Sequence, residues 1–344
     1  MKVVHVHRMR GIGGSERHLL TVLPALREHG IDARFAGLDD ARGWDPDPFY
    51  DALERVGVPY VRLSGPRRLR RVLRGADAVH THLAHADAYG AVLAHGTRLF
   101  STKHNDDRFR TGPWRFVERA LTRRVERVVA ITHALARFQI ERVGLPAAKV
   151  EVIHYGLDEP PEPWGANPAL ELGDGPIVAA TSRLVPQKGV DVAVRAAAGL
   201  DVTLIVLGEG PEREPLETLA RELGVRLLLP GRVPDVAAVL RRADVFVHPA
   251  RWEGFGLAVL EAMLCSLPVV ATNVSSLPEL VADGESGVLV PPDDPEALRA
   301  ALARVLADPG KLGASGYDRA RREFSVERMA TKTAAIYAPF SDAR

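Results

Sequence analysis

The chain has 344 residues, of which 46% are hydrophobic and 26% charged, so it is long enough for two folded domains and too apolar for a disordered chain. A single cysteine, Cys265, excludes an internal disulfide framework and a metal site built from several cysteines. No stretch of 18 uninterrupted apolar residues occurs, and the N-terminus lacks the long apolar core of a signal peptide. A cytosolic location is therefore expected.

The formal net charge is only +1, but the charges are unevenly distributed. Residues 1–160 contain 26 lysines and arginines against 19 acids, whereas the remainder contains 19 against 25. Arginines are most concentrated at 67–74 and at 108–127. A basic surface there would favour an anionic acceptor or weak peripheral association with the inner face of a membrane, and the alternative is a solvated helix face. No nucleic-acid partner is expected.

Short apolar runs alternate with helical patterns along the whole chain. The expected strands are residues 2–7, 33–38, 78–82, 98–103, 127–131 and 150–154 in a first series, then 177–182, 203–207, 225–229, 245–248, 268–271 and 287–290 in a second. The clearest helical patterns are residues 16–28, 190–197, 211–223 and 256–265. This alternation predicts an α/β fold of βαβ units with parallel sheets, whose ligands bind at the carboxyl ends of the strands.

A proline-rich stretch, residues 159–168, separates the two series of strands. Its four prolines can continue neither a helix nor a central strand, so the expected domains are residues 1–160 and 161–325. A last helix at about 326–337 follows the second sheet. In that position residues 326–344 could cross back onto the first domain.

The first strand runs into a glycine-rich loop that contains Gly11, Gly13 and Gly14 and leads into a helix. Glycines let the backbone approach a ligand closely, and the amides at a helix start can meet an anion. The Gly-x-Gly-x-x-Gly spacing of dinucleotide-binding proteins fails here, and the lysine of a P-loop is missing. Taken alone, a tight turn between strand and helix explains the loop equally well.

Two cations follow the first strand of the second series. Arg183 and Lys188 lie after the carboxyl end of that strand and near the start of the next helix. Arginine offers a planar fork for phosphate oxygens, and lysine offers a compact point charge. A diphosphate leaving group needs such neutralisation, so the pair indicates a diphosphate site. The alternative is two surface cations in a loop.

Two carboxylates follow the strand at 245–248. Glu253 lies in a Glu-Gly-Phe-Gly loop, and Glu261 lies about one turn into an apolar helix where a carboxylate must find a partner. Carboxylates accept hydrogen bonds from pairs of sugar hydroxyls, so two at this separation could hold the transferred hexose and the ribose of one donor. The free amides of Gly256 and Leu257 could face an anion. Solvated acids at a helix start are the alternative.

Taken together, these segments resemble the large retaining glycosyltransferase family 4 and its Glu-x7-Glu motif. The resemblance extends over most of the chain. It includes Gly-Gly-x-Glu at 13–16, Val-His-Thr-His at 79–82, Lys-His-Asn at 103–105, Val-Ile-x-x-Gly-x-Asp at 152–158, Ser-Arg-Leu-x-x-x-Lys-Gly at 182–189, Gly-Glu-Gly-Pro at 208–211, Pro-Val-Val-Ala-Thr at 268–272 and Leu-Pro-Glu-Leu-Val at 277–281. It implies the GT-B fold, in which two Rossmann-like β/α/β domains face each other across a cleft. It also implies a hexosyltransferase that uses a nucleotide-diphosphate sugar as donor substrate.

The resemblance implies roles for residues of the second half. Arg183 and Lys188 would bind the donor diphosphate, Glu253 would contact the hydroxyls of the transferred sugar, and Glu261 would contact the ribose. Backbone groups would complete the donor site: the amides of Phe255, Gly256 and Leu257 for the sugar phosphate, and the backbone near Arg232 and Val233 for the base.

In the first half, the resemblance implies that Gly13 and Gly14 close over the diphosphate and that His104 hydrogen-bonds to the transferred sugar near its anomeric carbon. Tyr155 departs from the family pattern, which commonly has an asparagine before the Gly-x-Asp. Tyr155 is expected in a hinge, without a catalytic role.

No residue stands out as a carboxylate nucleophile. The resemblance implies a reaction on one face of the sugar. The departing phosphate oxygen would accept the proton of the acceptor hydroxyl. No metal and no cofactor are expected: Asp45 and Asp47 have the Asp-x-Asp form of metal-dependent transferases but lie among prolines, which favours a turn. The pairs His5/His7 and His80/His82 each share a strand face and could ligate zinc, but no further ligand is fixed near them.

Three functions remain open at this point. The favoured one is transfer of a hexose from a nucleotide sugar to an acceptor hydroxyl on a glycan, a lipid-linked sugar or a small molecule. The second is an epimerase of nucleotide sugars or a sugar phosphorylase on the same fold. The third is a non-catalytic protein that binds nucleotide sugars, against which the intact pair Glu253 and Glu261 argues.

Overall fold

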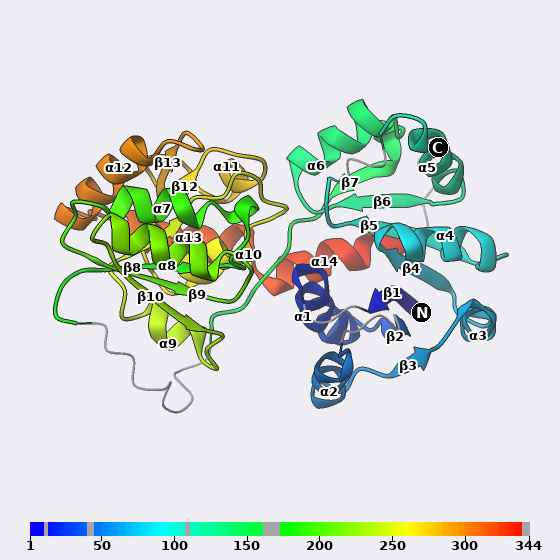
Figure 1. Ribbon diagram of the computed structural model, residues 1–344. Helices are drawn as coiled ribbons and strands as arrows, with labels where there is room; N and C mark the ends of the chain where they lie inside the picture. The colour runs from blue at the N-terminus through cyan, green and yellow to red at the C-terminus, as the bar shows by residue number, and fades with distance from the viewer. Residues whose placement is uncertain (10–12, 40–44, 107–110, 161–172, 339–344) are drawn as a thin grey trace. The chain divides into compact units, whose positions relative to one another are not determined.

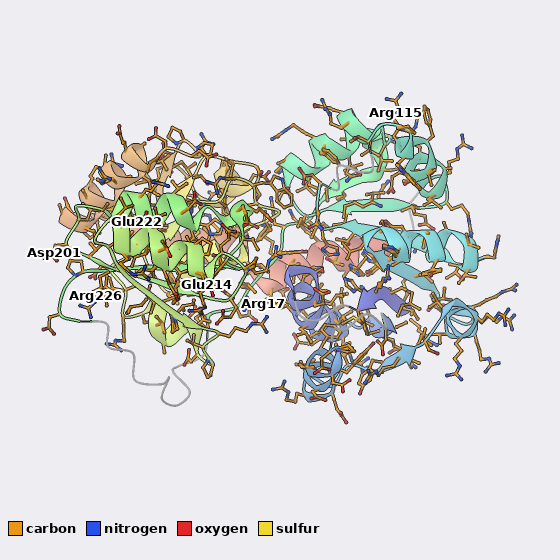
Figure 2. The ribbon with its side chains drawn as sticks, in the orientation of Figure 1. Arg17, Arg115, Asp201, Glu214, Glu222 and Arg226 are labelled. Carbon is orange, nitrogen blue, oxygen red and sulfur yellow. The ribbon has the colours of Figure 1, made fainter. Side chains whose placement is uncertain are left out.

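The computed structural model describes residues 1–9, 13–39, 45–106, 111–160 and 173–338 (Figure 1). The chain divides into two compact units. Unit 1 comprises residues 1–156 and 325–344, and unit 2 comprises residues 157–324. Charged side chains such as Arg115 in unit 1 and Glu222 in unit 2 lie on the outside of their units (Figure 2).

Unit 1 is built on a seven-stranded parallel sheet with the order β3-β2-β1-β4-β5-β6-β7. Its strands are β1 (Lys2–Met9), β2 (Asp32–Asp39), β3 (Tyr60–Leu63), β4 (Ala78–His82), β5 (Arg98–Lys103), β6 (Arg127–Ala130) and β7 (Val150–Val152). Its helices are α1 (Gly14–Glu28), α2 (Asp47–Arg55), α3 (Pro66–Leu73), α4 (Leu83–Leu93), α5 (Trp114–Thr122), α6 (His133–Arg137) and α14 (Val326–Tyr337), with short helical segments η2 (Phe138–Val143) and η3 (Ala147–Lys149).

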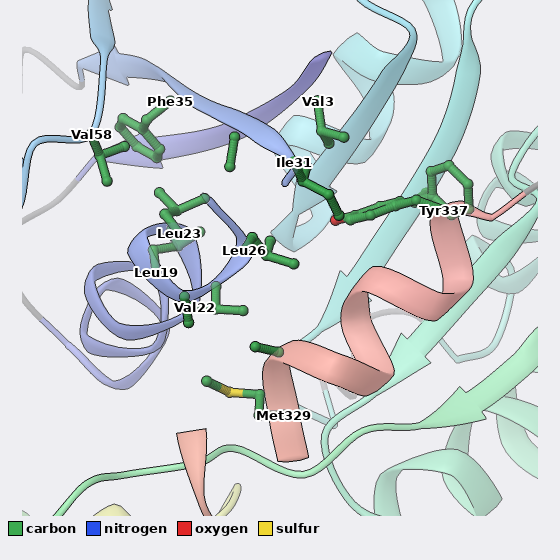
Figure 3. Packing of buried hydrophobic residues seen from close by; sticks show 14 of the residues in the cluster. Val3, Leu19, Val22, Leu23, Leu26, Ile31, Phe35, Val58, Met329 and Tyr337 are labelled. Atoms are coloured by element: carbon green, nitrogen blue, oxygen red, sulfur yellow. The ribbon is translucent and has the colours of Figure 1, made fainter. Parts of the chain in front are cut away.

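Two hydrophobic clusters cover the two faces of this sheet, because the buried strands carry apolar residues on both sides. On one face, helices α1 and α14 pack together over β1, and Leu23 and Leu26 of α1 belong to the same hydrophobic cluster as Met329 and Tyr337 of α14 (Figure 3). The other face is covered by α3, α4 and the segment that follows α5. Each fully buried leucine of this kind contributes about 1.5–3 kcal/mol relative to exposure.

Unit 2 is built on a six-stranded parallel sheet with the order β10-β9-β8-β11-β12-β13. Its strands are β8 (Ile177–Thr181), β9 (Thr203–Leu207), β10 (Arg226–Gly231), β11 (Val245–His248), β12 (Val269–Thr272) and β13 (Val288–Val290). Its helices are α7 (Val190–Ala197), α8 (Arg213–Glu222), α9 (Val236–Leu240), α10 (Leu257–Leu264), α11 (Leu277–Leu280), α12 (Pro295–Ala307) and α13 (Leu312–Glu323), with the 3-10 turn η4 (Pro186–Lys188).

Each sheet reverses its strand order once. In unit 1 the reversal lies between β1 and β4, and in unit 2 it lies between β8 and β11. Loops that leave two such strands run to opposite faces of the sheet and leave a crevice at their carboxyl ends, which is where parallel α/β sheets bind ligands. The predicted α/β class is confirmed, and the segments predicted to bind the donor follow β8 and β11.

The division between units falls between Gly156 and Leu157 and again between Phe324 and Ser325. Residues 161–168 of the proline-rich stretch taken as the boundary from the sequence lie outside the described residues. At the crossing in unit 1, a Cβ on Gly156 would collide with the carbonyl oxygen of Ser325, so only glycine allows the two segments this approach. Helix α14 begins after Ser325, whose hydroxyl accepts the N–H of Arg328, and it belongs to unit 1.

Among the described helices, none combines the length and the apolar character needed to cross a bilayer.

Candidate functional site

The loop after β8 carries the two predicted cations. Backbone bonds from the N–H of Ser182 to Leu207 and from the N–H of Leu184 to Glu209 tie this loop to the end of β9. Arg183 is exposed, and its side chain has no hydrogen bond or ion pair with any residue that the structure describes. It is therefore a cation available to a ligand.

The loop turns back at Gly189, which has a φ of 64° and begins α7. A Cβ at Gly189 would collide with the carbonyl oxygen of Pro249, just beyond β11. The left-handed backbone and the close approach both require glycine, and together they bring the preceding residue, Lys188, beside the loop that follows β11.

Lys188, His248 and Glu253 converge at this point, although Glu253 lies 65 residues from Lys188 in the sequence. One carboxylate oxygen, Oε2 of Glu253, accepts hydrogen bonds from Nζ of Lys188 at 2.6 Å and from Nε2 of His248 at 2.8 Å. The other oxygen, Oε1, accepts the N–H of Gly254 at 3.0 Å. Both oxygens of the half-buried carboxylate are therefore fixed in position.

Burial would raise the pKa of Glu253, but the hydrogen bond from His248 and the positive charge of Lys188 outweigh burial and hold this pKa well below its usual range. The carboxylate therefore stays ionised at neutral pH. It can accept hydrogen bonds from sugar hydroxyls but cannot donate a proton to a leaving group.

Arg251 ties the two loops together. Its guanidinium donates to both carboxylate oxygens of Asp191, at 2.9 and 2.8 Å, and to Oδ1 of Asp293 at 2.7 Å. The backbone N–H of Arg251 donates to the carbonyl of Gln187 at 2.9 Å. The amide of Gln187 in turn donates to the carbonyl of Trp252 at 3.0 Å. A bidentate arginine of this kind imposes geometry, so it fixes the position of Lys188 relative to Glu253.

The start of α10 presents the backbone predicted to meet the sugar phosphate. Gly256 is the N-cap with a φ of 102°, and helical residues begin at Leu257. The hydroxyl of Ser276 donates to the carbonyl of buried Phe255 at 2.9 Å, which fixes the loop before the helix. The first amides of a helix have no partner within it, so they can receive an anion. Glu261 is half-buried one turn further on.

The residues predicted to lie near the base follow β10. Arg232 is exposed and Val233 half-buried, and both come directly after Gly231, the last residue of the strand. The donor segments of unit 2 thus follow β8, β10 and β11 at the same edge of the sheet.

The first glycine loop is only partly described, because Gly11 lies outside the described residues. Gly13 is the N-cap of α1, and its N–H donates to Oε2 of Glu16 at 3.0 Å. The same oxygen accepts the hydroxyl of Ser15 at 2.9 Å. A carboxylate of the chain itself thus occupies the position at which the sequence suggested an anion, with Gly14 as the first helical residue.

His104 lies in a buried chain of histidines. Its Nε2 is 3.0 Å from Nδ1 of His82, and Nε2 of His82 is 3.0 Å from Nδ1 of His5. On its other side, Nδ1 of His104 contacts the hydroxyl of Tyr155, whose ring stacks on His18 at 4.4 Å between centroids. Both ring nitrogens of His104 therefore have protein partners, and a sugar hydroxyl would have to displace one of them.

The hydrogen bonds in this chain must all run in one direction. A neutral imidazole donates through one ring nitrogen and accepts through the other. If Tyr155 donates to His104, then His104, His82 and His5 all carry their proton on Nε2, and if Tyr155 accepts, all three carry it on Nδ1. Burial, followed by the neighbouring histidines, lowers the pKa of His5 and His82 well below the usual value, so these two rings are neutral.

The structure brings His5, from one of the two histidine pairs seen in the sequence, beside the other pair, His80/His82. His5, His80 and His82 place one ring nitrogen each within 4.8 Å of one another, and all three are buried. Their hydrogen bonds already satisfy these rings: His80 contacts the hydroxyls of Tyr337 at 2.5 Å and Thr102 at 2.7 Å. The cluster therefore needs no ion to satisfy its polar atoms. The Asp-x-Asp sequence forms the predicted turn, because Oδ1 of Asp45 accepts the N–H of Asp47 at 3.0 Å.

A buried lysine, which the sequence did not single out by itself, precedes His104. Nζ of Lys103 lies 2.6 Å from Oδ2 of Asp87 and 2.6 Å from Oε1 of Glu118, and all three side chains are buried. Oδ1 of Asp87 also accepts the hydroxyl of Ser101 at 2.6 Å. This group fixes the end of β5 and hence the backbone that carries His104. The sequence analysis did not predict this group, which joins a lysine at the end of β5 to acids of α4 and α5.

Comparison with known proteins agrees with this geometry. Residues 12–159 match the sequence family described as Glycosyltransferase Family 4, and residues 167–323 match Glycosyl transferases group 1. The chain is 31% identical to the alpha-maltose-1-phosphate synthase of Mycolicibacterium smegmatis, over 94% of this chain and 95% of that protein. It is 33% identical to a GDP-mannose-dependent phosphatidylinositol monomannoside mannosyltransferase of the same organism, over 63% of each chain.

Solved structures show the same fold. The crystal structure of Anabaena HepE in complex with UDP and glucose superposes with a TM-score of 0.85 over 97% of this chain and 98% of that one, at 21% identity. Sucrose-phosphate synthase from Thermosynechococcus elongatus superposes with a TM-score of 0.78 over 98% of both chains, at 22% identity. The chain therefore belongs to glycosyltransferase family 4, and it is a glycosyltransferase with the GT-B architecture of two parallel-sheet α/β domains.

Proposed function

We propose that the protein transfers a hexose from a nucleotide-diphosphate sugar to an acceptor hydroxyl with retention of configuration and without a metal ion. The observation that supports this most directly is the convergence of Lys188, His248 and Glu253, at the point where the strand order of the second sheet reverses. Arg183 lies in the same loop as Lys188, after β8. The expected cytosolic location is part of the same proposal.

The two cations have different tasks in this proposal. Arg183 has no partner among the described residues and offers its fork directly to the diphosphate. Lys188 donates a hydrogen bond to Glu253 and would share its charge with a phosphate oxygen of the bound donor. Charge builds on the diphosphate as the bond to the sugar breaks, so both cations stabilise the transition state more than the bound donor.

The carboxylates and amides would orient the donor. We assign Glu253 to hydroxyls of the transferred sugar, because its pKa keeps it an acceptor, and Glu261 to the ribose. Three residues at the start of α10 would receive the sugar phosphate through their amides: Phe255, Gly256 and Leu257. The backbone near Arg232 and Val233 would meet the base.

No side chain in this set is suited to be a covalent nucleophile, because both oxygens of Glu253 already accept hydrogen bonds from Lys188, His248 and the N–H of Gly254. In the proposed step, the bond between the anomeric carbon and the phosphate oxygen breaks while the acceptor oxygen bonds to the same face of that carbon. The acceptor's proton passes to the departing phosphate oxygen. His104 would hydrogen-bond to the sugar only by giving up one of its two protein partners.

A panel of UDP-, GDP-, ADP- and dTDP-sugars, scored by the shift in melting temperature, would test the donor part of the proposal. Binding to the folded state alone stabilises it by about 2.7 kcal/mol at a hundredfold excess over Kd. We expect one base to give a clear shift, and a Lys188→Ala or Arg183→Ala variant to lose it. No shift with any donor would contradict the proposal.

Product analysis would test the reaction. We expect a glycoside plus a nucleoside diphosphate, with the anomeric configuration of the donor and with undiminished turnover in EDTA. Free epimerised sugar nucleotide would instead show an epimerase, and a sugar 1-phosphate formed with inorganic phosphate would show a phosphorylase. Donor binding without turnover across acceptors would show a non-catalytic protein. Loss of activity in EDTA and its recovery with manganese would contradict metal independence.

A further inference from the structure

Unit 1 has one face on which three helices lie side by side. Helix α4 packs between α3 and α5, and the apolar residues beneath them form one cluster against the sheet (Figure 1). Helices α1 and α14 pack in the cluster on the opposite face of the sheet. The outer surface of α3, α4 and α5 is here called the α3–α5 face.

The charge of the α3–α5 face is almost entirely positive. Nine exposed arginines lie on α3 and α5 or directly after them: Arg67, Arg68, Arg70, Arg71, Arg74, Arg115, Arg119, Arg123 and Arg124. None forms an ion pair with a residue that the structure describes, and Arg124 alone donates to backbone carbonyls. The carboxylates of the three helices, Asp87 and Glu118, point inward to the buried Lys103.

The same face also exposes large apolar side chains. Trp114 and Phe116 are each 60% exposed, Val117 is 47% exposed and Val92 of α4 is 61% exposed. Helix α5 buries Glu118 and a threonine while it leaves its aromatic residues in solvent, which is the reverse of a helix adapted to water on its outer side. Figure 2 shows Arg115 on this outer side of unit 1.

We propose that the α3–α5 face docks on the surface of an anionic lipid bilayer. Tryptophan and phenylalanine prefer the boundary between headgroups and acyl chains, and arginines flanking them can bind headgroup phosphates. A second copy of the chain fits less well, because a symmetric contact would bring the same unpaired arginines of both copies together. The proposal concerns location and does not depend on the donor assignment, so the two can fail separately.

Sedimentation with vesicles would test the proposal. With 30% phosphatidylglycerol in phosphatidylcholine at 0.1 M NaCl, the wild-type chain should pellet, and with pure phosphatidylcholine or at 0.5 M NaCl it should stay largely in solution. Each arginine at such a surface contributes about fivefold to partitioning. Replacement of Arg67, Arg68, Arg70 and Arg71 by glutamine should therefore weaken binding more than about 100-fold.

The apolar part has its own variant and controls. Trp114→Ser with Phe116→Ser and Val117→Ser should abolish pelleting, because these side chains anchor the face. The exposed residues Arg221 and Leu223 of unit 2 provide the controls: Arg221→Gln and Leu223→Ser should change nothing. Circular dichroism and the melting temperature would show that each variant is folded.

A spectroscopic readout locates the contact. The chain contains four tryptophans, so the emission of Trp114 is taken as the difference between the wild type and Trp114→Phe. That emission should shift to the blue with anionic vesicles. Absence of pelleting, equal pelleting with pure phosphatidylcholine, or an unchanged apolar triple variant would each overturn the proposal. So would a concentration-dependent dimer that the triple variant abolishes without any lipid binding.

Discussion

Unit 1 should lose stability in mild acid because of its buried histidines. The pKa of His18 and the pKa of His80 are each lowered to about 3, mainly by burial, from an ordinary value of about 6.5 in the unfolded chain. The unfolded state therefore binds more protons between these values. Stability is fully present above about pH 6.5 and is lost as the pH falls toward the folded pKa.

The loss can be worked out for one ring. Between pH 7.5 and pH 5.5, an imidazole that stays neutral in the folded state and titrates at about 6.5 in the unfolded state destabilises the fold by about 1.4 kcal/mol. His18 and His80 together give about 3 kcal/mol. His5 and His82, whose pKa values are also lowered well below normal, act in the same direction and add to this loss.

Hydrogen exchange on peptides from β1 and β4, corrected for the intrinsic pH dependence, would measure this loss within unit 1. His18→Phe should reduce the difference between pH 7.5 and pH 5.5 by about 1.4 kcal/mol. The exposed His95 is the control, and His95→Gln should leave the difference unchanged. Equal protection at both pH values, to within about 1 kcal/mol, would refute the reasoning.

Three further predictions concern the site and the residues behind it. Lys188→Ala should lower kcat/KM for the donor about 30- to 150-fold, with part of the loss in kcat, since a hydrogen bond to a charged group contributes about 2–3 kcal/mol. Steady-state kinetics would measure this loss, and Lys311→Ala, at an exposed lysine of the same unit, should have no effect. Lys103→Ala should destabilise unit 1 by about 3–5 kcal/mol in urea unfolding, because two buried carboxylates lose their cation, and a change below about 1 kcal/mol would contradict the burial of an ionised group. Nitrogen NMR of the histidines should show His5, His82 and His104 protonated on the same ring nitrogen, Nε2 in all or Nδ1 in all, and mixed forms would contradict the one-directional chain.

Local patterns in the sequence were sufficient for the fold class and for most strands. Helix 190–197 was predicted with the bounds that α7 has, because its apolar residues recur with the helical period. Strand β3 (Tyr60–Leu63) was missed, since it is a short edge strand whose residues are mostly half-exposed or exposed and form no apolar run.

The sequence predicted more of the donor segments around Glu253 in unit 2 than of the histidine chain around His104 in unit 1. Around Glu253, the motifs in the sequence predicted the two cations and the two acids, and the structure brings Lys188 and Glu253 together. The partner His248 was noted only as the end of a strand. Around His104, the sequence placed Tyr155 in a hinge, and the division between the units follows at Gly156. The contacts of the Tyr155 hydroxyl with His104 and of its ring with His18 were not predicted.

The amino-acid order by itself determined which segments become strands and helices and which loops carry charge, because these depend on residues a few positions apart. Which loops become neighbours depends on the order of strands within each sheet, and that order is set by the packing of the whole unit. Only the tertiary structure could therefore place β11 beside β8, join Glu253 to Lys188, and line up imidazoles from β1, β4 and the end of β5 in one buried chain.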